Sequence, residues 1–110
     1  MALTSLENFG AIIEQSAALL DALGVNMALE GAKDMAEFAG YCWAFGGRSG
    51  DALRAMARAR STYYLALNSR MRAACRCVLE AVDAALAAAG LTLRARNPYA
   101  LAEALARLFG

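Results

Sequence analysis

Three cysteines are the first residues of this sequence whose type could carry chemistry. Cys42, Cys75 and Cys77 are possible metal ligands, but the chain contains no histidine to complete such a site. Their odd number also excludes a full set of internal disulfides. We therefore expect reduced, buried thiols that pack as small apolar groups, with no bound metal and no cofactor.

A glycine-rich segment, Gly46-Gly47-Arg48-Ser49-Gly50, is the second candidate for chemistry. It matches neither common phosphate-binding pattern, because GxGxxG is absent and no Gly-Lys-Ser/Thr follows. The serines have no histidine to activate them, and the acidic residues are spread along the chain rather than paired. The sequence therefore predicts a protein that is not an enzyme.

Arginines dominate the middle of the second half. Six of them lie between Asp51 and Glu80 with no acidic residue among them, and Tyr63 and Tyr64 fall in the same stretch. The six are Arg54, Arg58, Arg60, Arg70, Arg72 and Arg76. Arginine interleaved with aromatic residues can bind nucleic acid, but the net charge is only +1, whereas nucleic-acid-binding domains are usually strongly basic. The pattern favours a cationic helix face over a nucleic-acid site.

Charge is divided unevenly along the chain. Residues 1–50 carry two basic and six acidic side chains, while residues 51–110 carry nine arginines and four acidic residues. This asymmetry predicts that one half lies against the other, or against a partner of opposite charge.

The hydrophobic fraction is 60%, a value inflated by alanine. The longest charge-free runs are ten residues, over Phe38–Gly47 and 84–93, whereas a membrane span needs about 20. The first residues lack the basic region of a secretory signal peptide, and Glu7 and Glu14 interrupt the first apolar stretch. The sequence predicts no membrane span and a protein that is cytoplasmic or exported without a cleaved signal peptide.

Apolar spacing predicts three helical segments in a single domain of residues 1–110. The first covers 5–45, with a possible break near 24–26 at Gly24 and Asn26. The second is one long helix over 51–89, because no Gly or Pro lies between Asp51 and Ala89. The third is a short helix over 98–109, which starts at Asn97 as cap and Pro98 as first helical residue.

The long helix carries an apolar stripe with steps of three or four residues. We expect it to be an interface, formed by Met56, Tyr64, Leu67, Met71, Val78, Val82 and Leu86. Arg60 falls on the same stripe, where a charge needs either a buried partner or an exposed end. The predicted fold is all-α: an antiparallel helical hairpin with a short C-terminal helix, completed to a four-helix bundle by dimerisation.

Two short strings resemble the WXG100 (ESX-type) family of small helical proteins. Trp43-Ala44-Phe45-Gly46-Gly47 resembles the family's Trp-Gly turn, and Tyr99-Ala100-Leu101-Ala102-Glu103 is similar to its YxxxD/E secretion signal. The resemblance implies a helical hairpin that pairs with itself or a related chain and leaves the cell by type VII secretion. It implies a turn role for Trp43, Gly46 and Gly47, and a partner or secretion signal at Tyr99 and Glu103.

The expected function is therefore a non-enzymatic protein–protein interaction module whose partner is a second copy or another protein. Two alternatives stay open: a cytoplasmic helical adaptor or inhibitor unrelated to secretion, and a nucleic-acid-binding dimer that uses the Arg-rich face. Nucleic acid is the less favoured partner because of the near-neutral charge.

Overall fold

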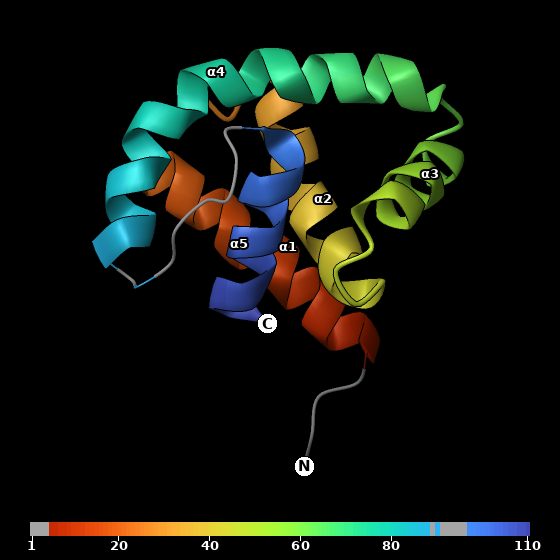
Figure 1. The fold of residues 1–110 in the computed structure, drawn as a ribbon, viewed down its shortest axis with the longest axis horizontal. Coiled ribbons are helices and arrows are strands. Elements are labelled where there is room, and N and C mark those ends of the chain that lie inside the picture. The colour runs from red at the N-terminus through yellow and green to blue at the C-terminus, as the bar shows by residue number, and fades with distance from the viewer. Residues whose placement is uncertain (1–4, 89, 91–96) are drawn as a thin grey trace.

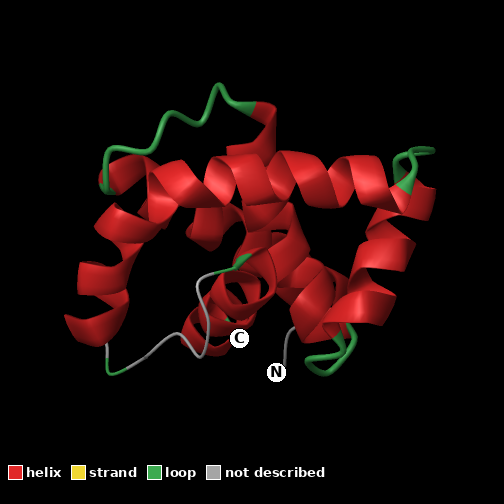
Figure 2. Cartoon of the chain, turned by 45° about the horizontal axis from the view of Figure 1, so that its top comes forward, coloured by secondary structure: helices red, strands yellow, loops and turns green. Residues whose placement is uncertain are grey.

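Five helices form the part of the chain that the computed structural model describes, residues 5–88, 90 and 97–110. They are α1 (Ser5–Ala22), α2 (Glu30–Ala44), α3 (Ser49–Ala59), α4 (Tyr64–Ala88) and α5 (Pro98–Phe109). Figure 1 shows α4 lying across a group formed by α1, α2 and α5, with α3 at one side. Figure 2 shows that the described segments are helices joined by loops, which confirms the predicted all-α class.

The most enclosed helix is α2, which contacts each of the other four. Its small side chains allow this position, because they let neighbouring backbones approach closely. A Cβ added at Gly31 would lie 2.6 Å from both the Cβ of Ala74 and the carbonyl oxygen of Arg70, so α2 and α4 meet at that glycine. Phe38, on the same helix, has no exposed surface and fills the centre of the core.

The predicted segment over 5–45 is two helices that pack side by side rather than in line (Figure 1). Gly24 has a φ of +89°, and the N–H of Val25 donates to the carbonyl of Leu20 at 3.0 Å. This is a Schellman motif, which ends a helix by turning the chain through a left-handed residue. The possible break near 24–26 is therefore a complete change of direction.

The long helix predicted over 51–89 is also divided, into α3 and α4. Ser61 adopts a left-handed φ of +51°, and the N–H of Thr62 donates to the carbonyl of Ala57 at 2.9 Å. The same Schellman geometry thus ends α3 without a glycine. The bend lets both α3 and α4 pack on α2, which a straight rod of this length could not do.

These two breaks replace the predicted hairpin of two long helices with four shorter helices, and α5 completes the bundle. α5 begins directly after its N-cap residue Asn97, whose side chain accepts a hydrogen bond from the N–H of Ala100 at 2.9 Å. Leu101 and Leu105 of α5 then enter the same apolar cluster as Met56 and Met71. The chain's own helices cover much of the surface for which a second copy was expected.

Candidate functional site

The predicted interface stripe lies largely in the core of the chain. Met56, Leu67, Met71 and Val78 are buried, and only Tyr64 of the described stripe residues is exposed. The side chains of Val82 and Leu86 lie outside the described residues. The spacing identified an apolar face correctly, but α2 and α5 cover it. The four buried residues are therefore not available to a partner in this structure.

The predicted turn motif does lie between two helices. Gly46 and Gly47 have φ values of +63° and +88°, and the N–H of Gly47 donates to the carbonyl of Cys42 at 2.9 Å. Trp43 and both glycines line a hollow of about 430 Å³ between the ends of α2 and α5, and Glu103 lies at the same hollow. The structure thus brings the turn motif together with one half of the predicted secretion signal.

The other half of that signal, Tyr99, lies one turn before Glu103 on α5 and does not line the hollow. Its ring meets Phe38 edge to face, with centroids 5.7 Å apart, and its hydroxyl donates to Oδ1 of Asn68 at 2.9 Å. The guanidinium of Arg72 lies 5.8 Å from the centroid of the same ring. Tyr99 therefore holds α5 against α2 and α4, which is a packing role rather than an open recognition site.

Cys42 is buried beside the turn motif. Burial raises the pKa of its thiol to about 12, and the negative charge of Glu103 adds to the shift. A thiol with this pKa stays protonated near neutral pH, so it is neither a good nucleophile nor a ready metal ligand. Cys75 is buried as well, while the side chain of Cys77 lies outside the described residues.

We expect Cys42 and Cys75 to resist a thiol-specific reagent in the folded protein at pH 8 and to react when urea unfolds it. The measurement uses a Cys77→Ser background, so that only these two thiols are counted.

Because the folded-state pKa of Cys42 lies above its ordinary 9.0, the neutral thiol contributes stability that is present below pH 9 and lost as pH rises toward about 12. A Cys42→Ala variant should lack this loss of stability at alkaline pH. Rapid labelling of Cys42 before unfolding would contradict the interpretation of Cys42 as a buried, protonated thiol.

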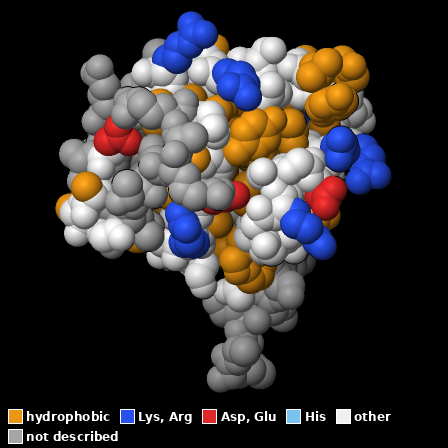
Figure 3. Space-filling view, in the orientation of Figure 1, with side chains coloured by type: hydrophobic (Ala, Val, Ile, Leu, Met, Phe, Trp, Pro, Cys, Tyr) orange, Lys and Arg blue, Asp and Glu red, His pale blue; other side chains and the backbone are white. Residues whose placement is uncertain are grey.

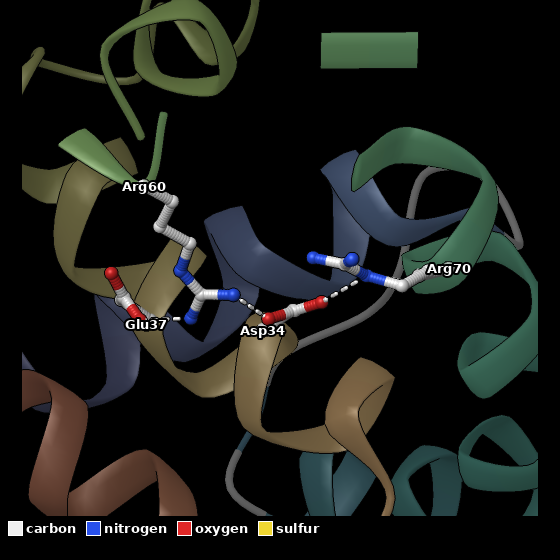
Figure 4. Close-up of polar contacts among 4 residues, drawn as sticks. All are labelled: Asp34, Glu37, Arg60 and Arg70. Carbon is white, nitrogen blue, oxygen red and sulfur yellow. Dashed lines mark hydrogen bonds and ion pairs between the residues drawn. The ribbon is translucent and has the colours of Figure 1, made fainter. Parts of the chain in front are cut away.

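Four charged residues form a cluster where α2 meets α3 and α4 (Figure 4). Asp34 is only 1% exposed, and its two carboxylate oxygens accept from Arg60 on one side and from Nε of Arg70, at 3.2 Å, on the other. Arg60 also donates to Glu37. Burial alone would lower the pKa of Arg60. The hydrogen bonds and negative charges of Glu37 and Asp34 raise it by more than burial lowers it, so the pKa is shifted upward.

This cluster supplies the buried partner that Arg60 needs on an otherwise apolar stripe. It also joins the acidic first half of the chain to the Arg-rich second half, as the charge asymmetry predicts. Each charge in the cluster has an opposite neighbour, so the cluster joins α2 to Arg60 at the end of α3 and to Arg70 of α4.

The exposed side of the same bend carries the most prominent aromatic surface of the described residues. We call it the corner surface, and it consists of Arg54, Arg58, Tyr63, Tyr64 and Leu65. Tyr63 and Leu65 are 62% and 47% exposed, and Arg54 and Arg58 are exposed beside them. Figure 3 shows hydrophobic side chains gathered over the start of α4, with Lys and Arg side chains next to them over α3.

Three residues of the corner surface, Arg54, Tyr63 and Tyr64, lie against one another. The rings of Tyr63 and Tyr64 have centroids 5.2 Å apart, and the guanidinium of Arg54 lies 6.0 Å from the ring of Tyr64. Together with Ala57, Arg58 and Thr62 they line a hollow of about 310 Å³. The turn at Ser61 creates this surface, so the sequence indicated its residue types but not their arrangement.

No protein-family model, curated protein or solved structure matches this chain. Within the described residues, no group of three or more His, Cys, Asp or Glu side chains is placed to hold a metal ion. None of the described helices is long and apolar enough to cross a membrane. The candidate site is therefore chosen from the structure of this chain alone, and it is the corner surface.

Proposed function

We propose that the chain is a non-enzymatic protein-interaction module whose interface is the corner surface. The observation that carries this proposal is the exposure of two tyrosines that line a hollow together with two arginines, with the exposed Leu65 next to them in the sequence. Tyrosine and arginine are enriched among the residues that contribute most to binding at protein interfaces. Exposed apolar side chains gathered in one place, rather than scattered singly, are typical of an interaction site.

The residue chemistry supports binding over catalysis. The sequence has no histidine, the thiol of Cys42 is held protonated, and Arg60 and Asp34 neutralise each other. The proposal keeps the pairing that the WXG100 resemblance implies, with a second copy or another chain, but moves it from the stripe to the corner surface. Export by type VII secretion stays a prediction of that resemblance.

The test is capture of a partner from the native cell by the tagged full chain and by two variants. Tyr63→Ala with Arg58→Ala should reduce capture at least tenfold, which corresponds to about 1.4 kcal/mol. Arg76→Ala is the matched control, since Arg76 is exposed on α4 but outside the corner surface, and it should leave capture unchanged. All these side chains are exposed, so their loss should change stability by less than about 0.5 kcal/mol.

Equal capture by the wild-type chain and the corner variant would count against the proposal, because the partner would then use another surface. Melting curves of both variants provide the folding control.

A further inference from the structure

The charge asymmetry of the sequence is only partly used within the folded chain. Asp34 and Glu37 of α2 pair with Arg60 and Arg70 of the second half. α1 is acidic too and contains no lysine or arginine, but it packs mainly on α2 and α5. The acidic side chains of α1 therefore need a different explanation from those of α2.

Two carboxylates lie along the exposed side of α1. Glu14 and Asp21 are seven residues apart, which is about two helical turns, so they share one side of the helix with Ala18 between them. All three residues are exposed. Among the described residues, no ion pair joins Glu14 or Asp21 to a basic side chain. We call these three residues the α1 face, which is negatively charged and has only a methyl group between its two carboxylates.

The stability of α1 does not explain the carboxylate of Asp21. This residue lies in the last turn of the helix, at the negative end of the helix dipole, and α1 has no basic residue in that turn. A carboxylate at this end of a helix is unfavourable unless a cation lies near it. A basic group from another molecule would therefore stabilise Asp21.

The corner surface has the opposite charge. Arg54 and Arg58 are exposed there, and among the described residues their one acidic partner is Asp51, 3.9 Å from Arg54 in an exposed pair of little strength. Tyr63, which is 62% exposed, lines the same hollow as both arginines. Arginine binds carboxylates through charge-assisted hydrogen bonds. The corner surface thus offers the cations that the α1 face lacks, together with an aromatic ring that can pack on its alanine.

From this complementarity we infer that the α1 face of one copy of the chain docks on the corner surface of a second copy. Arg54 and Arg58 of one copy bind the two carboxylates, and the tyrosine rings pack over Ala18. The carboxylates are about 10 Å apart along α1 and the arginines about 6 Å apart along α3, a difference that extended arginine side chains cover. The inference rests on the proposed function and names a second copy as the partner.

The two surfaces lie on different sides of the molecule. Figure 1 shows the C-terminal end of α1 on the left and α3 on the right, with α2 and α5 between them. One contact between two copies therefore leaves one α1 face and one corner surface unused. The association is head to tail, and it continues beyond two copies unless the copies close into a ring.

Sedimentation velocity of the purified full chain tests the inference. Self-association should be detectable at concentrations up to about 1 mM in about 20 mM salt, and should weaken at least tenfold in about 500 mM salt, because salt screens exposed charges. Glu14→Gln with Asp21→Asn should also weaken it at least tenfold. Glu30→Gln, which removes an exposed carboxylate of α2 outside both surfaces, is the matched control and should leave self-association unchanged.

A second double variant, Arg54→Gln with Arg58→Gln, should be equally impaired, with Arg76→Gln as its unchanged control. This variant keeps its α1 face, whereas the variant of the α1 face keeps its corner surface. Each should be monomeric alone, and a mixture of the two should form a 1:1 pair that does not grow further. All the substituted side chains are exposed, and melting curves provide the folding control.

Three results would overturn the inference: a chain that stays monomeric in low salt, self-association that both double variants retain, or a mixture without the 1:1 pair. Oligo(dT) that binds Arg54 and Arg58 more tightly than the second copy does would also overturn it, in favour of nucleic acid. The proposed function is judged separately. A cellular partner lost with Tyr63→Ala and Arg58→Ala supports the corner surface even if the chain is monomeric, because that partner is then another protein.

Discussion

Replacing Arg60 with methionine is expected to lower the free energy of unfolding by about 3 kcal/mol, because it removes one partner of a buried carboxylate. Asp34 is 1% exposed and binds Arg60 through one oxygen and Arg70 through the other. Methionine fills much of the space of the arginine side chain, so the loss reflects the uncompensated charge rather than a cavity. Urea denaturation monitored by circular dichroism gives the value.

Two controls separate charge from packing. Arg58→Met removes an exposed arginine from the last turn of α3, just before Arg60, and should cost less than about 0.5 kcal/mol. The double variant Asp34→Asn with Arg60→Met should be less destabilised than Arg60→Met alone, since no buried charge is left without its partner. If the free energy of unfolding of Arg60→Met lies within about 1 kcal/mol of the wild-type value, Arg70 alone satisfies Asp34 and the cluster does not set the bend.

Local pattern was sufficient for the turn at Gly46-Gly47 and for the start of α5, whereas it marked Gly24 only as a possible break. Gly24 and the glycine pair Gly46-Gly47 all adopt positive φ at helix ends, and Asn97 caps α5 through its side chain. The bend between α3 and α4 carries no such signal, because Ser61 takes a left-handed φ that is uncommon for any residue except glycine and asparagine. What favours the bend is distant in sequence: Arg60 reaches Asp34 and Glu37 on α2.

Predicting the site required knowing which surfaces the chain itself covers. Periodicity identified Met56, Leu67 and Met71 as apolar, but a pattern on one helix does not say whether its cover comes from the same chain. Tyr63 and Tyr64 lie among the arginines in the sequence, but only the turn at Ser61 places them at an exposed corner. The hollows beside α4 that Leu29 and Lys33 line depend on residues from another segment of the chain, which no local spacing reveals.

Replacing Tyr99 with alanine is the second change expected to have a large effect. The ring packs on Phe38, its hydroxyl donates to Asn68, and the side chain is partly buried. We expect a loss of about 3 kcal/mol, the lower end of the range for a truncated buried aromatic. For a domain of this size that lowers the melting temperature by roughly 13 °C.

A Tyr99→Phe variant removes only the hydroxyl and should cost about 1 kcal/mol, the usual net value of one hydrogen bond. The interpretation of Tyr99 as a recognition signal predicts the reverse for Tyr99→Ala, namely an unchanged melting temperature with loss of export or of partner capture. Glu103→Gln is the companion test, since a signal read jointly needs both residues, whereas packing of Tyr99 does not. A Tyr99→Ala variant that melts like the wild-type chain but captures no partner would support the interpretation of Tyr99 as a recognition signal. It would contradict the role of Tyr99 in holding α5 to the bundle.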